Sequence, residues 1–246
     1  MDFTNKVALV TGGGRDIGKS VSQLLAANGA HVVVNYRSDE ASAQATIDEI
    51  TAAGGSATLH RADVTNAGEV AGLVEAAGER IDVLVNLAGG MIARKTLAEQ
   101  DEAFFDQVVD LNLKSVWLVT KAALPKLGQG SAIVNVSSLA GRDGGGPGAS
   151  IYATAKGALM TLTRAWAKEF GPQGIRVNAV CPGLIGTSFH DIFSKPEGRA
   201  AVAGNTPLRR EGGPDEVAEL IAYLASDGAS FLTGTCVDIN GGLGFS

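Results

Sequence analysis

The sequence has little of what defines several other classes of protein. It contains only two cysteines, Cys181 and Cys236, and three scattered histidines, none at metal-ligand spacing. This scarcity argues against a disulfide framework or a zinc site and favours a reducing compartment. The N-terminus enters an apolar stretch at once, without the hydrophobic segment and cleavage site of a signal peptide. No apolar run approaches the ~18 residues of a membrane-spanning helix, so we expect a cytoplasmic protein without a membrane partner.

Positive charge is also scarce. Lys and Arg number 20 against 26 Asp and Glu, a net charge of −6, which argues against nucleic acid as the main partner. The 33 glycines follow no period, which argues against collagen-like and low-complexity chains. Hydrophobic residues make up 45% of the 246. That share is ample for a core, and we expect a single domain over residues 1–246.

What the chain does have is an alternation of short β-branched runs and longer helical patterns. Strands are predicted at 6–10, 31–36, 56–64, 81–89, 131–138, 175–182 and 236–240. Helices are predicted near 17–28, 39–53, 67–78, 101–126, 151–170 and 214–226. This rhythm predicts an α/β fold, a doubly wound, mostly parallel seven-stranded sheet with helices on both faces, as in the Rossmann fold. Segments 141–150 and about 184–213 break the rhythm after strand ends, so we expect them to form the walls and lid of a substrate pocket.

The first strand runs into a glycine-rich turn, TGGGRDIG at 11–18. Such a turn lets backbone amides and a helix N-terminus approach a pyrophosphate. The second strand ends in Asn35 and Tyr36, followed by Arg37 and Ser38. An arginine here suits the 2′-phosphate of NADP, whereas an NAD site usually has an acid at the strand end. We therefore predict NADP(H) as cofactor; the alternative for Arg37 is a solvated loop arginine.

Tyr152 and Lys156 lie four residues apart in YATAK, at the start of an apolar-periodic stretch. This spacing places a phenol and an ammonium on one helix face. A lysine charge about 4 Å away, at an effective dielectric of about 20, would favour phenolate by roughly 4 kcal/mol. The phenol's pKa would then fall by at most about three from its usual ~10, towards the range of general acid–base catalysis. The alternative is a surface pair on an amphipathic helix.

Together these motifs resemble the short-chain dehydrogenase/reductase family, in family order over nearly the whole chain. Its fingerprint TGxxxGIG is matched at four positions of the first turn, its NNAG by NLAG at 86–89, its YxxxK by Tyr152 and Lys156, and its PGxIxT at 182–187. The resemblance implies a catalytic set of Asn112, Ser138, Tyr152 and Lys156. It also implies cofactor contacts by Thr11, Gly12, Gly14, Arg15, Asp16, Ile17, Gly18, Arg37, Ser38, Asp63, Val64, Asn86, Ala88, Gly89, Tyr152, Lys156, Pro182, Gly183, Ile185 and Thr187.

Two positions depart from the family pattern. Asp16 stands where the middle glycine belongs, and Leu87 replaces the second asparagine of NNAG. A carboxylate at position 16 either repels the cofactor phosphate or caps the following helix with its side chain turned away. Cofactor binding is expected to survive.

The resemblance gives each catalytic residue a role in reversible hydride transfer. Ser138 holds the substrate oxygen, Tyr152 donates its proton, Lys156 lowers the phenol's pKa and holds the nicotinamide ribose, and Asn112 holds a water that links Lys156 to solvent. Without the resemblance, Ser138 reads as a strand-end turn serine and Asn112 as a packing or kink residue, because asparagine is a poor helix former.

The overall pattern is similar to that of bacterial 3-oxoacyl-thioester reductases, so the predicted substrate is a ketone, most simply a 3-oxoacyl thioester. Lys126 is the only cation where that group places its carrier-docking arginines, so a free ketone, diketone or coenzyme A thioester competes. The alternatives are an oxidative alcohol or sugar dehydrogenase and a non-catalytic NADP sensor. Phe189, Ile192, Phe193 and Met91 either line an apolar pocket or pack within the lid.

The resemblance also implies a homotetramer. Helices 101–126 and 151–170 would pair across one interface, and the C-terminal strand across another. The aromatic residues on those two helices serve either that contact or the core of one subunit. They are Phe104, Phe105, Trp117 and Trp166.

Overall fold

The structure is a computed structural model and describes residues 1–245. Within them, strands form one seven-stranded parallel sheet in the order β3-β2-β1-β4-β5-β6-β7. The strands are β1 (Val7–Thr11), β2 (His31–Tyr36), β3 (Ser56–Arg61), β4 (Val83–Asn86), β5 (Ala132–Val136), β6 (Arg176–Pro182) and β7 (Cys236–Ile239). The order reverses between β1 and β4, and in such sheets the crevice outside the strands' carboxyl ends at this point is where ligands bind. The predicted fold class is confirmed.

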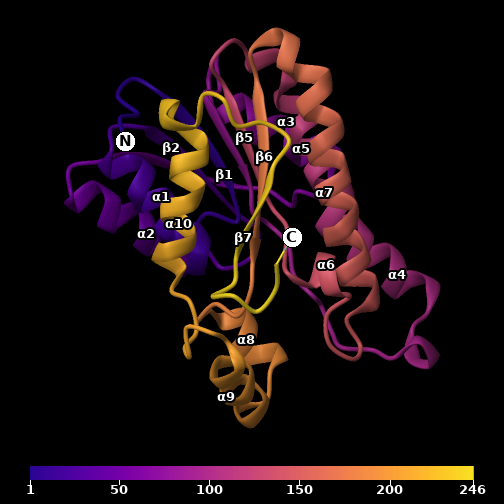
Figure 1. Ribbon diagram of the computed structural model, residues 1–246. Helices are drawn as coiled ribbons and strands as arrows, with labels where there is room; N and C mark the ends of the chain where they lie inside the picture. The colour runs from indigo at the N-terminus through magenta and orange to yellow at the C-terminus, as the bar shows by residue number, and fades with distance from the viewer. Residues whose placement is uncertain (246) are drawn as a thin grey trace.

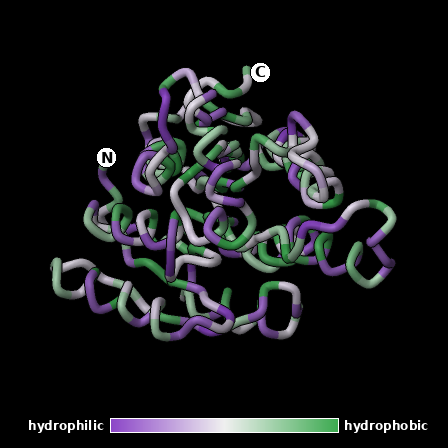
Figure 2. The backbone as a smooth tube through the Cα atoms, turned by 90° about the horizontal axis from the view of Figure 1, so that it is seen from below, coloured by the Kyte–Doolittle hydropathy of each residue, from purple (hydrophilic) through white to green (hydrophobic). Residues whose placement is uncertain are grey.

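Helices cover both faces of the sheet (Figure 1). One face carries α1 (Asp16–Ala27), α2 (Glu40–Ala52) and α10 (Pro214–Ala225). The other carries α3 (Ala67–Ala76), α5 (Ser115–Ala123) and α7 (Ser150–Phe170). Because both faces are covered, the central strands are apolar at successive positions and fully buried. Figure 2 shows hydrophilic positions interleaved with hydrophobic ones along the peripheral helices, as expected for helices with one solvent face.

The helix predicted over 101–126 is not continuous. It consists of α4 (Glu102–Val109), a π turn (Asp110–Lys114), α5 and a short 3₁₀ turn, η3 (Leu124–Lys126). The cause lies in Asn112, whose side-chain amide donates to the Val108 carbonyl at 2.9 Å. A side chain inserted into the helical ladder in this way produces such a bulge.

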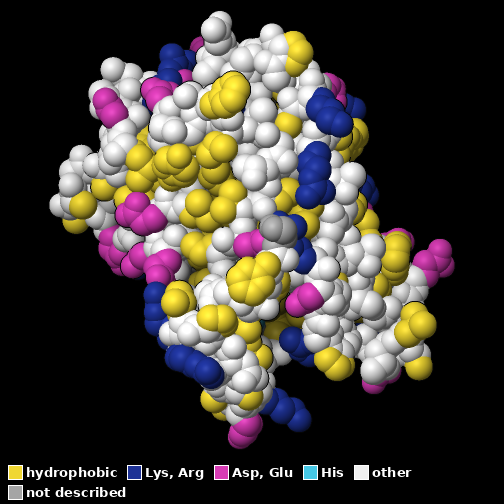
Figure 3. Space-filling model, in the orientation of Figure 1, with side chains coloured by type: hydrophobic (Ala, Val, Ile, Leu, Met, Phe, Trp, Pro, Cys, Tyr) yellow, Lys and Arg dark blue, Asp and Glu magenta, His cyan; other side chains and the backbone are white. Residues whose placement is uncertain are grey.

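The predicted lid segment contains two helices, α8 (Ser188–Phe193) and α9 (Pro196–Asn205). They project beyond the carboxyl edge of the sheet at the foot of Figure 1. In Figure 3 a notch separates them from the region that carries α4 and α6 (Ala140–Asp143). Arg199 holds the lid together by pairing with Asp191 and, at 2.5 Å, with Glu211.

Three further one-turn helices in the described residues connect these elements or close their ends. They are η1 (Leu97–Glu99), η4 (Gly171–Gln173) and η5 (Asp227–Ala229). None of the helices in residues 1–245 has the length and apolar character that crossing a membrane requires.

Candidate active site

The glycine-rich turn after β1 is built on backbone that only glycine fits. Gly12 has a φ of +66°, and a Cβ on Gly18 would lie 2.1 Å from the Gly12 carbonyl oxygen. The Gly12 amide donates to the side-chain oxygen of Asn35 at 3.2 Å, and the Asn35 amide donates to the Ala62 carbonyl at 3.0 Å. The end of β2 therefore supports the turn, a role of Asn35 that the sequence analysis missed. The result is a backbone cradle at the first strand–helix junction, the position at which folds of this kind bind a dinucleotide pyrophosphate.

Thr11 and Asn86, two predicted cofactor contacts, have partners inside the protein. The Thr11 hydroxyl accepts from the amides of Leu87 at 3.0 Å and Ala88 at 3.1 Å. It thereby holds the turn after β4 beside the glycine turn, where a Cβ on Gly12 would lie 3.2 Å from the Ala88 Cα. Asn86 donates to Thr120 and Asn135 in the core. Its Oδ1 is the one buried side-chain polar atom without a partner in the described part of the chain.

The turn after β4 also meets two of the four predicted catalytic side chains. Asn112 donates to the Gly90 carbonyl at 2.8 Å and accepts from the Gly90 amide at 3.0 Å. A Cβ on Gly89 would lie 2.9 Å from Asn112 Oδ1 and 3.1 Å from Lys156 Nζ. Gly89 thus lets both side chains close on the turn. The Lys156 ammonium donates to the Val136 carbonyl at the end of β5, at 2.8 Å.

Ser138 and Tyr152 complete the group. Burial raises the pKa of the Tyr152 phenol above its usual value, and the neighbouring Ser138 hydroxyl acts to lower it. Lys156 Nζ lies 5.8 Å from the centroid of the Tyr152 ring. The net shift of the phenol's pKa is upward, opposite to the lowering expected from the lysine charge, and its largest cause is desolvation. The phenol is neutral at pH 7, the form that can donate a proton.

Burial also shifts the pKa of Lys156. Desolvation lowers the pKa of its ammonium from 10.5 to about 8. A buried lysine with a pKa this close to neutrality is typical of functional sites, where charge is placed for chemistry and not for stability.

The predicted cofactor contacts Arg37, Ser38, Asp63 and Val64 lie in the loops that follow β2 and β3. The Arg37 side chain is 61% exposed, and its guanidinium lies 3.9 Å from the Asp63 carboxylate. Asp63 also accepts from the Thr65 amide at 2.9 Å. Ser38 is exposed, while Val64 is buried. A cation with one loose ion pair is free to take a phosphate.

Asp16 neither faces the glycine cradle nor caps its own helix. The residue at the N-cap of α1 is Arg15, which makes no side-chain cap hydrogen bond. Asp16 has a φ of +50°, a left-handed conformation that costs a residue with a side chain roughly 1 kcal/mol. Its carboxylate accepts hydrogen bonds from the amide and hydroxyl of Ser188 in the lid. The capping expectation is therefore wrong, although the side chain is turned away from the turn.

The predicted PGxIxT residues lie where β6 leads into the lid. Pro182 and Ile185 are buried, and a Cβ on Gly183 would lie 2.6 Å from the Asn240 Cβ. Thr187 is the residue before α8, and its hydroxyl donates to the Ile185 carbonyl at 3.2 Å. This segment brings the start of the lid to the glycine turn.

The lid contributes aromatic side chains and one contact that the sequence analysis missed. The Phe189 ring lies 5.9 Å from the Tyr152 ring and 5.0 Å from the Phe193 ring. Met91 is buried, whereas Ile192 is 66% exposed. Arg94 donates to the carbonyls of Phe193 at 2.8 Å and Pro147 at 3.1 Å. It joins three loops around the site, and nothing in its local sequence signals this.

Known proteins resemble the chain over nearly its whole length. Residues 12–244 match the family described as enoyl-(acyl carrier protein) reductase. A 3-oxoacyl-[acyl-carrier-protein] reductase of Synechocystis is 41% identical over 249 residues, covering 98% of each chain. A short-chain dehydrogenase of Burkholderia cenocepacia in complex with NADP superposes with a TM-score of 0.93 at 32% identity, covering 98% of this chain and 99% of the other. The chain belongs to the short-chain dehydrogenase/reductase family.

The protein is therefore an oxidoreductase of that family, as the motifs predicted. A further relative, an NADH-dependent reductase responsible for alginate metabolism, has a TM-score of 0.90 and 36% identity, covering 99% of each chain. Relatives with different dinucleotides thus share the fold closely. The choice between the two must be argued from the residues of this chain.

Proposed function

We propose that the protein is an NADP(H)-dependent carbonyl reductase that reduces a ketone to an alcohol. One observation carries the proposal: the neutral Tyr152 phenol and the buried Lys156 ammonium lie together beside the glycine cradle, at the carboxyl edge of the sheet. A nicotinamide dinucleotide supplies the hydride when it is bound. The protein supplies the proton and the orientation.

Each polar side chain has a distinct task in this scheme. The Ser138 hydroxyl donates a hydrogen bond to the ketone oxygen and stabilises the alkoxide that develops there. Tyr152 gives that oxygen its proton, and the Lys156 charge stabilises the phenolate left behind. Asn112 holds the Gly89–Gly90 turn against Lys156. Its Oδ1 keeps one lone pair free, which is the acceptor needed for a water that returns the proton.

The choice of NADP(H) is supported by the end of β2. Asn35 at that end is buried and already bonded to Gly12, so no acid holds a ribose hydroxyl from this position. Arg37 follows with an exposed guanidinium, which suits a 2′-phosphate. The glycines of the cradle are backbone positions and do not discriminate between the two dinucleotides.

The proposed substrate is a 3-oxoacyl thioester or a related ketone or diketone. The Synechocystis relative supports the thioester. Lys126, the one cation at the expected carrier-docking positions, donates to the Val74 carbonyl and pairs with Glu75 at 3.1 Å. Its engagement favours a free ketone or a coenzyme A thioester over a carrier-bound chain.

A homotetramer is part of the proposal, with a smaller set of contact residues than the sequence analysis offered. Phe105 is 49% exposed and Trp117 is 43% exposed, so both are available to a second subunit. Phe104 and Trp166 are buried and belong to the core of one subunit. Light scattering of the purified protein tests the assembly.

The test of the function is dinucleotide oxidation with a panel of ketones. Acetoacetyl-coenzyme A, a diketone and an aryl ketone are each combined with NADPH and with NADH. We expect kcat/KM to be at least tenfold higher with NADPH, and Arg37→Ala to remove most of that preference, about 1–2 kcal/mol for a charge-assisted phosphate contact. Arg37→Lys, which keeps the charge but loses the fork, is expected to fall between them. A wild-type preference for NADH, or no turnover of any ketone, contradicts the proposal.

A further inference from the structure

Asp16 makes a contact that a glycine at its position lacks. Its Oδ1 accepts from the Ser188 amide at 3.0 Å and its Oδ2 from the Ser188 hydroxyl at 2.5 Å. The two residues are 172 positions apart in the chain. One lies at the start of α1 beside the glycine cradle, and the other is the first residue of lid helix α8. Hydrogen bonds to a charged acceptor are among the stronger ones, so this contact ties the cradle to the lid.

The position of Ser188 makes the contact relevant to chemistry. The next residue, Phe189, packs its ring 5.9 Å from the ring of Tyr152. Fixing Ser188 therefore fixes the aromatic side chain that covers the proposed proton donor. The far end of α8 is held separately, because Arg94 donates to the Phe193 carbonyl. Asp16 holds the near end.

Backbone geometry indicates that the carboxylate is retained for this contact and not for local folding. Asp16 has a left-handed φ of +50°, which a glycine adopts without strain. It makes no cap hydrogen bond to α1, and the nearest cation, Arg15, lies 3.9 Å away with a 59% exposed side chain. Its remaining partner is the lid.

We propose that Asp16 is a positioning residue that clasps the lid to the cofactor turn and thereby sets Phe189 against Tyr152. The inference rests on the proposed function for its kinetic consequence, but the clasp itself is a structural property. Its expected effect is on the carbonyl substrate: loss of the clasp raises the KM for the ketone about tenfold. The dissociation constant of NADPH changes by less than threefold, since the carboxylate points to the lid and away from the cradle.

Four variants separate the clasp from simple charge repulsion. Asp16→Gly removes the acceptor and relieves the backbone, so the fold is retained. Asp16→Asn removes the charge but keeps an oxygen that accepts from the Ser188 amide. Ser188→Pro removes both donors; proline is favoured at a first helical position, and the preceding Thr187 is already extended, at φ −142° and ψ 162°. The double variant Asp16→Gly/Ser188→Pro tests whether the two positions act as one.

The primary readout is hydrogen exchange of residues 186–194 in the free protein, which needs no turnover. We expect exchange to be at least fivefold faster than in the wild-type protein in both Asp16→Gly and Ser188→Pro. The double variant should exchange no faster than either single variant. Asp16→Asn should exchange at close to the wild-type rate. Ser20→Ala is the matched control, because Ser20 makes a hydroxyl–carboxylate bond of 2.5 Å to Asp215 on α10, away from the lid. It should leave exchange and ketone KM unchanged.

The outcomes are distinct. Unchanged lid exchange in Asp16→Gly overturns the clasp, and so does an equal tightening of NADPH binding in Asp16→Gly and Asp16→Asn, which is the signature of charge repulsion. Faster lid exchange with no ketone reduction by the wild-type protein leaves the clasp standing and refutes the proposed function instead.

Discussion

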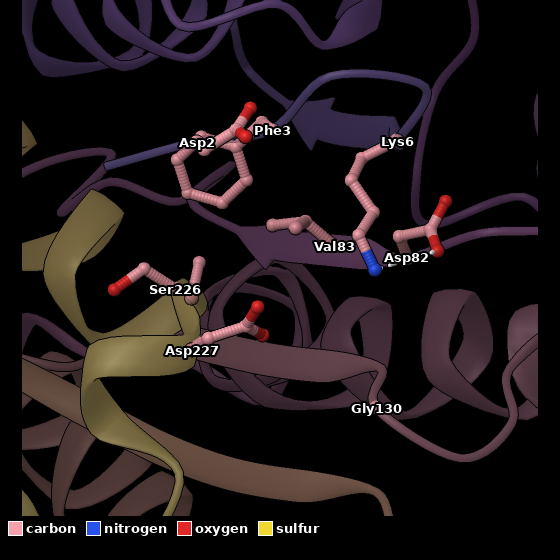
Figure 4. A pocket seen from close by; sticks show the side chains of 9 residues that line it. Asp2, Phe3, Lys6, Asp82, Val83, Gly130, Ser226 and Asp227 are labelled. Atoms are coloured by element: carbon pink, nitrogen blue, oxygen red, sulfur yellow. Dashed lines mark ion pairs between the residues drawn. The ribbon is translucent and has the colours of Figure 1, made fainter.

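The two ends of the parallel sheet differ in how their polar groups are paired. At the amino end, Asp82 accepts from the Val7 amide at 2.8 Å and from Arg80 at 2.6 and 2.9 Å. The Lys6 ammonium lies 3.7 Å from the same carboxylate (Figure 4). The residues drawn there leave about 10 Å³ of free space, roughly that of one water molecule. The Asp82 carboxylate therefore has two cations beside it.

At the carboxyl end, several buried polar groups lack a charged or a hydrogen-bonding partner among the described residues. Lys156 is fully buried with only a neutral carbonyl as hydrogen-bond partner, and its pKa falls to about 8. The Tyr152 phenol is desolvated, and Asn86 Oδ1 has no partner among residues 1–245. Groups that satisfy one another stabilise a fold, whereas groups held short of satisfaction are available to a ligand. The contrast favours the carboxyl end as the site of the proposed chemistry.

The largest expected effect comes from the proton donor. Tyr152→Phe removes one hydroxyl and keeps the ring, so packing against Phe189 is preserved. We expect kcat/KM for ketone reduction to fall by about 10³-fold or more, the upper range for loss of a general acid. NADPH binding, followed by fluorescence titration, is expected to stay within about threefold of wild type. Substantial residual turnover would assign the proton to another group.

Lys156→Met sharpens the comparison by moving activity and stability in opposite directions. The folded-state pKa of Lys156 is about 8, against 10.5 as its ordinary value. Between those pH values the unfolded chain binds more protons, so this residue's contribution to stability improves as pH rises, and its full cost is present below pH 8. The variant should lose activity yet raise the free energy of unfolding at pH 7 by up to about 3 kcal/mol. That gain should shrink between pH 8 and 10.5, as measured by denaturant unfolding.

Asp82→Asn is the matched change at the other end of the sheet. It removes the negative charge that pairs with Lys6 and Arg80 but keeps a side chain of the same size. We therefore expect a loss of about 1 kcal/mol of stability at pH 7 and unchanged kcat/KM. The pair of variants tests the contrast itself. Destabilisation by Lys156→Met of the same size as by Asp82→Asn would mean that both ends are built for stability.

Much of the fold could be predicted because its signals are local. The seven strands were placed to within a few residues, since each is a short apolar run covered on both faces. The sequence predicts a continuous helix over 101–126, because the break depends on hydrogen bonds from the Asn112 side chain to the carbonyls of Val108 and Gly90. Gly90 lies 22 residues away in the chain.

The sequence predicts which residues make up the candidate site but not the direction in which their pKa values shift. The spacing of Tyr152 and Lys156 places them on one face of α7, as expected. It carries no information on burial, which reverses the direction of the phenol's pKa shift. The Asp16–Ser188 contact joins residues 172 positions apart and leaves no trace in local sequence. Long-range polar contacts and desolvation are properties of the assembled fold.

Isotope transfer tests the central claim most directly. NADPH deuterated at the transferable position of the nicotinamide is incubated with the wild-type protein and the ketone panel, and the alcohols are analysed by mass spectrometry. We predict one deuterium on the carbinol carbon with the wild-type protein and essentially no product with Tyr152→Phe. Absence of deuterated alcohol from every ketone, with NADPH bound, would contradict the account.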